Sequence, residues 1–516
     1  MTARYRAPAA DGGVLADPPF AALGAQLEEN RRRLAAPVRI LDVSLTEFRA
    51  AAAAEVLASA RDYLGDPPAV GGAGLLMAGH QPELFHPGVW AKNFALSQLA
   101  RTHGLVPLNL VVDNDTPRTA ALKIPVPANE PEHATAVTVP FDAAAGDAPY
   151  EETHVADREL FGSFAKQVRA HTGGWGYEPI LDNVWPCVVG AVDAGATPGE
   201  AFVRMRRCVE RAWGVANLEL PVSRLSGTQA FAGFVAAVLS DLPRFADAYN
   251  AAIRDYRAVN KLHSRNHPAP ELARDGGWVE APFWAWRAGS GRRERLFARR
   301  GEVAIELRAG GREVGRLPAD PTGFRTHWPA LAGAGWKIRP RALSLTLFVR
   351  LCLADGFLHG IGGGKYDEVT DAILRRYFGL TPPAFAVVTA TLRLPIPTFP
   401  TTVEDVRRTE RTVRDLDWKP ETTETVRSEF PDTVARKAAL LAAEPTPKGD
   451  RRRWFRELQG VTRSMRPAVA AEHDSAEARL ARMRRELVAN DVLKSREYSW
   501  VLFPESKLKA ALVGLG

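Results

Sequence analysis

The strongest constraint on the fold is a short apolar strand that runs into a polar turn and then into a helix. An apolar strand is expected over 75–79, the turn GHQPELFHPG spans 79–88, and an amphipathic helix is expected over 88–103. A second apolar strand is expected over 108–112. A strand, a helix and a strand joined by short links form a βαβ unit, so the sequence predicts a parallel sheet.

The second strand runs into a polar segment that contains Asp113, Asn114 and Asp115. The carboxyl ends of neighbouring parallel strands meet at one edge of a sheet, so this segment is expected at the same edge as His80. A strand end followed by a helix start is also a usual setting for an anion or nucleotide site. The sequence therefore predicts a binding site at this edge.

The pattern along the chain predicts an α/β protein with a Rossmann-like parallel-sheet core, a small β insert and a C-terminal helical hairpin or coiled-coil arm. An N-terminal helical segment over 1–70 is expected to end at the Gly and Pro residues of 65–68. The core is expected over 71–400, with a β-rich insert near 278–310. The charged, helix-forming arm is expected over 401–490, and an apolar return segment over 491–516.

Shorter patterns give the remaining elements. Helices are expected near 18–65, 151–171, 197–213, 228–261, 367–378, 402–417, 421–443 and 463–489. Strands are expected near 137–140 and 384–392, and a hairpin near 295–299 and 303–307.

Composition limits the class of protein. The chain has 516 residues, 46% of them hydrophobic, which predicts two or three domains with a large core. Three widely spaced cysteines argue against a disulfide framework or a zinc site, so no metal is predicted. We expect a cytoplasmic protein without a membrane span. The net charge of +7 is divided among short basic runs, which argues against nucleic-acid binding.

The turn supplies the candidate catalytic residues His80, His86 and Lys92. Imidazoles near a helix N-terminus can bind an anion or act as acid or base near neutral pH, and Lys92 lies one helical turn beyond Gly88. Gln81 and Asn93 are candidates for amide recognition. In the alternative interpretation, one histidine caps the helix or holds the turn.

A glycine-dense segment over 359–367 is the second candidate site, because glycine lets backbone N–H groups approach an anion closely. It matches neither a P-loop nor a Rossmann fingerprint, and a tight loop before a helix is the alternative. The candidate substrate-binding residues are His359, Gly362, Gly363, Gly364, Lys365, Tyr366 and Asp367, together with Asp113, Asn114 and Asp115. Asp113 and Asp115 alone are weak support for a divalent cation.

These motifs resemble those of the bacillithiol biosynthesis cysteine-adding enzymes, a family of cysteine ligases. That family has a G-Q-Q-x-G-x-x-x-G-P type turn, a helix with a lysine and an acidic E-D-H-D type strand end, similar here to 79–88, Lys92 and 113–115. Its R-P segment and G-G-P-x-E-x-x-Y type loop are similar to 339–341 and 362–366. His80 stands where the family has a glutamine, and Lys365 where it tends to have a glutamate.

The resemblance implies a ligase that forms a carbon–nitrogen bond between cysteine and a small, sugar-linked amine in low-molecular-weight thiol biosynthesis. We expect a small anionic substrate, with ATP as a candidate co-substrate. The long polar helices of the arm, with their sparse apolar positions, are a candidate homodimer contact. Two alternatives remain: a noncatalytic, metabolite-binding dimeric scaffold, and an enzyme similar to the class I nucleotidylyl transferases, whose H-x-G-H turn the segment around His80 partly matches.

Overall fold

The computed structural model describes residues 5–143, 146–264, 266–443 and 448–516, and the chain forms two compact units. Unit 1 comprises residues 1–124, 138–394 and 496–516, and unit 2 comprises 125–137 and 395–495. The boundaries at 394 and 495 lie close to the changes in character expected near 400 and 490.

A six-stranded, mainly parallel sheet forms the centre of unit 1 and confirms the predicted sheet. Its spatial order is β1 (Val14–Asp17), β16 (Ala386–Ala390), β15 (Gly356–His359), β4 (Leu75–His80), β5 (Val106–Val111) and β8 (Leu218–Pro221). Only β1, at one edge, is antiparallel to its neighbour. The chain proceeds from β4 through β5 to β8 and then returns to β15 on the other side of β4. The direction of winding therefore changes between β4 and β15.

Both faces of this sheet are buried, and β4 illustrates the reason. Leu75 and Met77 join one apolar cluster, whereas Leu76 and Ala78 join another. The first cluster includes residues of α2 (Leu45–Leu64) and α8 (Gln229–Ser240), and the second includes residues of α1 (Leu23–Leu34) and α3 (Pro87–Thr102). Successive side chains of a strand point to opposite faces, so a nearly continuous apolar strand needs a covering layer on each side.

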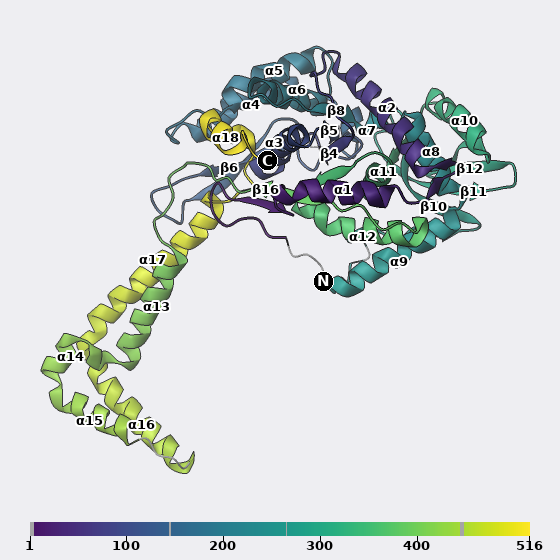
Figure 1. Cartoon of the computed structure of the whole chain (residues 1–516). Coiled ribbons are helices and arrows are strands. Elements are labelled where there is room, and N and C mark those ends of the chain that lie inside the picture. The colour runs from purple at the N-terminus through teal and green to yellow at the C-terminus, as the bar shows by residue number, and fades with distance from the viewer. Residues whose placement is uncertain (1–4, 144–145, 265, 444–447) are drawn as a thin grey trace. The chain divides into compact units, whose positions relative to one another are not determined.

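The remaining described helices of unit 1 pack against its sheets or against one another; Figure 1 shows α4, α5 and α6 grouped together. They are α4 (Arg158–Thr172), α5 (Leu181–Asp193), α6 (Pro198–Ala212), α7 (Val222–Leu225), α9 (Leu242–Asn260), α10 (Pro321–Gly333), α11 (Ala342–Cys352), α12 (Ile361–Phe378) and α18 (Glu505–Leu512).

Two expected long helices are interrupted. The helix expected near 18–65 is divided into α1 and α2 by a small hairpin of β2 (Arg39–Ile40) and β3 (Val43–Ser44), after which Ser44 and Glu47 form a capping box. The helix expected near 228–261 is interrupted at Asp241, two residues before Pro243. Proline lacks the N–H group and its ring clashes with the preceding turn, so a new helix begins there.

A second sheet in unit 1 is antiparallel, and the expected hairpin is part of it as β11 (Glu294–Arg300) and β12 (Ala304–Ala309). The order is β13 (Arg312–Pro318), β12, β11, β10 (Trp278–Arg287) and β14 (Trp336–Pro340), and β9 (Arg274–Asp275) pairs with β10. The insert is therefore larger than the expected range of 278–310, because β13 and β14 follow that range. Trp286 and Phe283 of β10 are buried.

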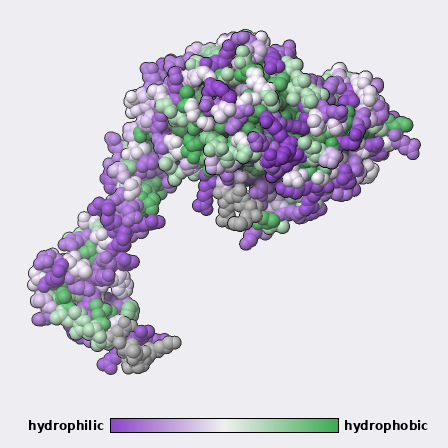
Figure 2. Space-filling model, in the orientation of Figure 1, coloured by the Kyte–Doolittle hydropathy of each residue, from purple (hydrophilic) through white to green (hydrophobic). Residues whose placement is uncertain are grey.

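Unit 2 is mainly helical. It contains α13 (Val403–Trp418), α14 (Glu424–Glu429), α15 (Pro431–Ala442), α16 (Lys448–Met465) and α17 (Ala470–Leu493), with α13 beside α17 (Figure 1). The expected helices 421–443 and 463–489 are wrong in their bounds, because the helical conformation is interrupted before Pro431 and around Pro467. Residues 125–137 of this unit include the tip between β6 (Ala121–Val126) and β7 (Thr135–Pro140), which pair with each other. Figure 2 shows that the visible surface of these helices is mainly hydrophilic.

Within the described part of the chain, no helix combines the length and the apolar character that crossing a bilayer requires.

Replacing Gly88 tests the close contact between α3 and the sheet. A Cβ atom at Gly88 would lie 2.3 Å from the carbonyl oxygen of Ala390, so backbone must move. We expect Gly88→Ala to lower the free energy of unfolding by about 1–3 kcal/mol in urea titrations. Gly162→Ala is the matched control, because nothing lies within 4 Å of a Cβ at this helical position. Equal unfolding midpoints for the two variants would contradict the close contact.

Candidate functional site

The polar residues singled out in the sequence gather at the carboxyl edge of the parallel sheet. His80 ends β4 and His359 ends β15, so the two histidines lie on adjacent strands where the winding direction changes. Helix α3 begins after β4 with His86 as its N-cap, and α12 begins after β15 with Gly360 as its N-cap. The unpaired N–H groups of both helix starts give this edge a positive potential.

His80 is buried, and both of its ring nitrogens face groups of the protein. Nδ1 lies 3.0 Å from the carbonyl oxygen of Gln81, and Nε2 lies 3.2 Å from Oδ1 of Asn93 and 3.5 Å from Nδ2 of Asn109. Burial, with the charges of Arg206 and Lys92, lowers the pKa of His80 well below its ordinary value. His80 is therefore neutral and holds the turn in place, and its predicted catalytic role stays a prediction.

An ion-pair network beneath His80 secures this arrangement. Arg206 of α6 contacts Glu210 at 2.6 Å and Glu219 of β8 at 2.7 Å, and all three side chains are buried. The two carboxylates also accept hydrogen bonds of 2.6–2.8 Å from neighbouring elements, the donors being Trp90, Asn93 and Asn109. Asn93, a candidate for substrate recognition, is thus fully engaged within the protein, since its amide nitrogen contacts Glu210 and its amide oxygen contacts His80.

Lys92 and His86 lie beside the same helix start. The Lys92 ammonium group is buried and donates to the carbonyl oxygen of Gly79 at 2.9 Å, and burial lowers the pKa of Lys92 to about 8. His86 Nδ1 accepts a hydrogen bond of 3.1 Å from the Gly88 N–H, which is the capping role that the alternative interpretation gave it. Burial, with the charges of Arg496 and Lys92, lowers the pKa of His86 to about 4.

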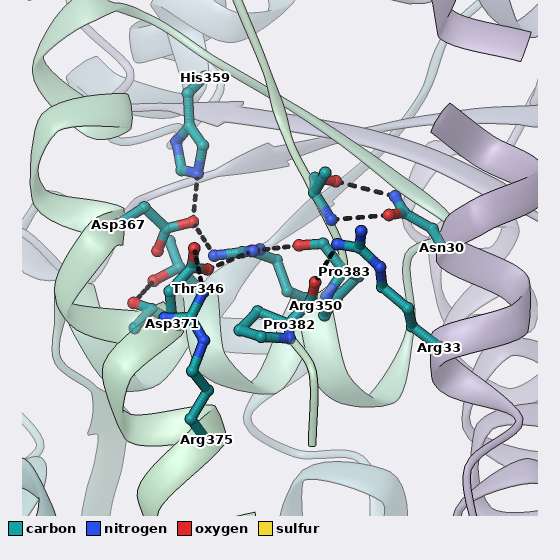
Figure 3. Close-up of polar contacts among 12 residues, drawn as sticks. Asn30, Arg33, Thr346, Arg350, His359, Asp367, Asp371, Arg375, Pro382 and Pro383 are labelled. Carbon is teal, nitrogen blue, oxygen red and sulfur yellow. Dashed lines mark hydrogen bonds and ion pairs between the residues drawn. The ribbon is translucent and has the colours of Figure 1, made fainter. Parts of the chain in front are cut away.

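His359 is oriented by a buried carboxylate (Figure 3). Its Nε2 lies 2.8 Å from Asp367 Oδ2, and Arg350 contacts the same oxygen at 2.6 Å and Asp371 at 2.7 Å. Burial raises the pKa of Asp367, but the charges of Arg350 and His359 and the hydrogen bonds from His359 and Thr370 together outweigh that effect, so the net shift of the pKa is downward. An ionised Asp367 fixes the proton of His359 on Nε2, so Nδ1 carries the lone pair.

The expected glycine loop is wrong: Gly362, Gly363 and Gly364 form the first turn of α12 instead. The glycines allow close packing, because a Cβ at Gly364 would lie 2.6 Å from Val387 and one at Gly363 would lie 2.6 Å from His359 Nδ1. Side chains on the outer face of this turn point elsewhere: Lys365 is exposed, and Tyr366 packs edge-on against the His267 ring.

The acidic strand end contributes a partly buried carboxylate to a small cavity. Asp113 accepts hydrogen bonds from the backbone N–H of Ser223, at 2.9 Å, and from its hydroxyl group. It lies with Ser223 and Glu151 in the wall of a cavity of about 150 Å³. Burial and the nearby Glu151 charge raise the pKa of Asp113 to about 7. Asp113 can therefore exchange a proton near neutral pH.

The second sheet supplies cations beside this cavity. Arg339 of β14 forms a bidentate pair with Glu151, with both contacts at 2.8 Å, and Lys337 contacts Glu151 at 3.0 Å. Arg293 lies 3.1 Å from Asp115. Glu151 is thus paired with two cations, whereas Asp113 accepts its side-chain hydrogen bonds from the uncharged groups of Ser223.

Other predicted residues link the turn to the acidic segment. Gln81 donates a hydrogen bond of 3.1 Å to Asp115, which places the turn and the acidic strand end side by side. Asn114 donates to the carbonyl oxygen of Pro340 at 2.8 Å, and its own amide oxygen is buried without a partner. These two amides serve internal contacts, and their predicted substrate contacts stay predictions.

Metal-type ligands gather elsewhere. In the described residues, three such ligand atoms lie within 4.8 Å of one another at His473, Asp474 and Glu477 of unit 2, where both carboxylates are exposed. Asp113 and Asp115 are not part of such a group, because Asp113 faces Ser223 and Asp115 faces Arg293 and Gln81.

The sequence analysis did not identify Ser223, Glu151, Arg206 or Glu219. The signal for Ser223 was hidden because the third parallel strand, Leu218–Pro221, is short and is interrupted by Glu219; it ends two residues before the serine. Glu151 and the two buried network residues carry no local pattern, because distant elements bring their partners to them.

Comparison with known proteins returns no match: no family model matches the chain, and no curated protein matches its sequence. The geometry of the carboxyl edge is therefore the basis on which a function can be argued.

The raised pKa of Asp113 predicts a stability gain when the carboxylate is removed. The folded protein holds this proton up to about pH 7, whereas the unfolded chain releases it near pH 4, so the group reduces stability as pH rises between these values. We expect Asp113→Asn to raise the free energy of unfolding at pH 8 by up to about 4 kcal/mol, since one pKa unit is worth about 1.4 kcal/mol. Urea titrations at pH 5.5 and 8 measure the gain, which should be smaller at pH 5.5.

The control for this experiment is Asp157→Asn, the same exchange at the N-cap of α4, where asparagine caps as well as aspartate. If Asp113→Asn is less stable than the wild type at pH 8, the pKa of Asp113 is not raised in the folded protein.

Adding a methyl group at Gly363 should displace His359 from Asp367. We expect Gly363→Ala to lower the free energy of unfolding by about 1–3 kcal/mol and to move the His359 imidazole resonances in ¹⁵N NMR spectra. Gly362→Ala is the neighbouring control, because a Cβ there meets nothing within 4 Å. Unchanged imidazole resonances in Gly363→Ala would argue against the contact.

Proposed function

We propose that this protein is an amide-forming enzyme of the cysteine-ligase type, which joins the carboxyl group of an amino acid to a small amine. The observation that carries the proposal is the division of one sheet edge into an acidic part around Asp113 and a cationic part around Lys92 and the two helix starts. An amine and a carboxylate are the two groups that such an edge suits.

The acidic part fits an amine acceptor. Asp113 lines a cavity, is hydrogen-bonded to the uncharged groups of Ser223 and has a pKa raised to about 7. A carboxylate of this kind can bind an ammonium group and accept one of its protons, which leaves the neutral amine that attacks. Ser223 orients the carboxylate through two hydrogen bonds.

The cationic part fits the carboxyl group that is attacked. After burial, the charge of Lys92 is among the causes that lower the pKa of His80, His86 and His359. Helix starts and a buried ammonium group stabilise the negative charge that develops on the carbonyl oxygen during attack. His359, fixed by Asp367, offers Nδ1 as a hydrogen-bond acceptor.

Condensation of a carboxylate with an amine forms one C–N bond and releases the elements of water. In aqueous solution this step needs an activated carboxyl group, and ATP is the co-substrate that we propose for that activation. Activation as an acyl phosphate would release ADP, and attack by the amine would then release phosphate. Activation as an acyl adenylate would release pyrophosphate, and attack would then release AMP. In either case Asp113 takes one proton from the ammonium group before attack, and the second proton leaves to the departing phosphate group or to water.

We also propose that the core of unit 1 is Rossmann-like. Counted along the chain, its parallel strands lie in the order third, second, first, fourth and fifth, and proteins of that class bind ligands where the winding direction changes. We further propose that α13 and α17 form a coiled coil that supports a homodimer.

Turnover with cysteine, ATP and amine acceptors tests the function by mass spectrometry. We expect wild-type product formation to rise with pH through about 7, because Asp113 becomes a base as its proton leaves. Asp113→Asn should lower kcat/KM by at least about 100-fold, and Asp157→Asn should not. Equal turnover in both variants would exclude Asp113 as the base.

A noncatalytic metabolite-binding protein is the second candidate, favoured by the internal engagement of His80 and His86. It predicts a ligand-induced rise in melting temperature with cysteine or an amine, without product in the same mixture.

A further inference from the structure

A second and larger cavity adjoins the Asp113 cavity. It has a volume of about 300 Å³, at the lower end of the range for ligand pockets. Pro82 and Tyr150 line both cavities, so the two share a wall. Pro82 belongs to the turn that follows β4, and Tyr150 immediately precedes Glu151. A molecule with one end at Asp113 must therefore reach past Pro82 and Tyr150 to place its remainder in the larger cavity.

The walls of the larger cavity are mainly apolar. Leu84, Leu122, Phe141 and Phe202 contribute apolar side chains, and several alanines and prolines complete the lining. Phe141 packs edge-on against Phe202, with ring centroids 5.6 Å apart. Rigid apolar walls of this kind favour a ligand with an aliphatic or aromatic body.

The charged residues in these walls are acidic. They are Glu83, Asp142 and Glu152, and no lysine or arginine is among the described residues that line the cavity. Lys337 contacts Glu152 at 2.9 Å and balances its charge. Asp142 accepts hydrogen bonds from three backbone N–H groups, and Glu83 accepts one from the Tyr150 hydroxyl group. A ligand with carboxylate or phosphate groups, such as a sugar acid, would place its negative charge against this acidic lining, where the described residues offer no lysine or arginine to pair with it.

We propose that the two cavities together bind a primary amine with an apolar body, the ammonium group at Asp113 and the body between Leu84, Leu122 and Phe202. The inference rests on the proposed role of Asp113 as the amine-binding carboxylate. It names the acceptor class as an amphipathic amine rather than a polyanionic sugar acid.

Calorimetric titration of the full-length protein at pH 8 tests the proposal with three probes. These are 2-phenylethylamine, glucosamine, which has an amine but no apolar body, and 3-phenylpropionate, which has the body but a carboxylate. We expect 2-phenylethylamine to bind at least ten times more tightly than either of the others. Comparable binding of 3-phenylpropionate, or no binding of 2-phenylethylamine at millimolar concentration, would overturn the proposal.

Variants locate the binding. Ala121→Trp and Ala156→Trp each place an indole in the wall of the larger cavity and should weaken 2-phenylethylamine binding at least tenfold. Ala54→Trp, on the exposed face of α2, is the matched control and should leave the affinity unchanged. Two wall positions are used so that one misfolded variant, detected by circular dichroism, does not decide the result. Unchanged affinity in the folded wall variants would overturn the proposal.

The titrations and the turnover assay separate the two proposals. Product formation from glucosamine without binding of 2-phenylethylamine would overturn this inference and leave the amide-forming function standing. Binding of 2-phenylethylamine that responds to the wall variants but not to Asp113→Asn would support the larger cavity as a site and reject the assigned role of Asp113.

Discussion

One buried guanidinium group connects the elements that form the proposed site. Arg206 contacts Glu210 and Glu219, and these carboxylates in turn hold α3 and β5 through Trp90, Asn93 and Asn109. Loss of Arg206 would remove the cation that bridges two buried carboxylates and leave Glu219 with the more distant Arg207, at 3.7 Å, as its cation. Breaking a buried ion pair in this way typically costs about 3–5 kcal/mol. The position of the turn after β4 therefore depends on an interaction that no substrate needs to touch.

Ionisable groups at the carboxyl edge are held away from the charge states that water would favour. Burial lowers the pKa of Lys92 to about 8 and raises that of Asp113 to about 7. Each group therefore takes up its charged form less readily than in the unfolded chain. Stability alone does not explain such groups, because apolar residues could fill the same space at lower cost. Their opposite shifts bring both groups close to a proton exchange at physiological pH, which is the property that an acid–base site requires.

Local patterns in the sequence predicted the parts of this fold whose cause is local. The apolar strand before His80, the helix after Gly88 and the strand before Asp113 follow from periodicity and from turn chemistry, and the parallel sheet follows from their order. The glycines at 362–364 misled, because glycine signals a loop in isolation but here permits a helix to lie close to Val387 and His359. Ser223 and Glu151 could not be foreseen, since their partners are distant in the chain and meet only through tertiary packing.

The charge of the Asp113 cavity depends on the pairing of two strands that lie outside the parallel sheet. Lys337 and Arg339 are two residues apart on β14, and both contact Glu151, while β14 is aligned with β10 so that these residues oppose Trp286 and Trp284. A slip of one residue would turn both cations to the opposite face and present Ile338 and Pro340 to Glu151. The register between these two strands, which are distant in the chain, thus determines whether Glu151 beside the cavity is paired with cations. A change anywhere along β10 or β14 that shifts the register would therefore change the charge of the cavity wall.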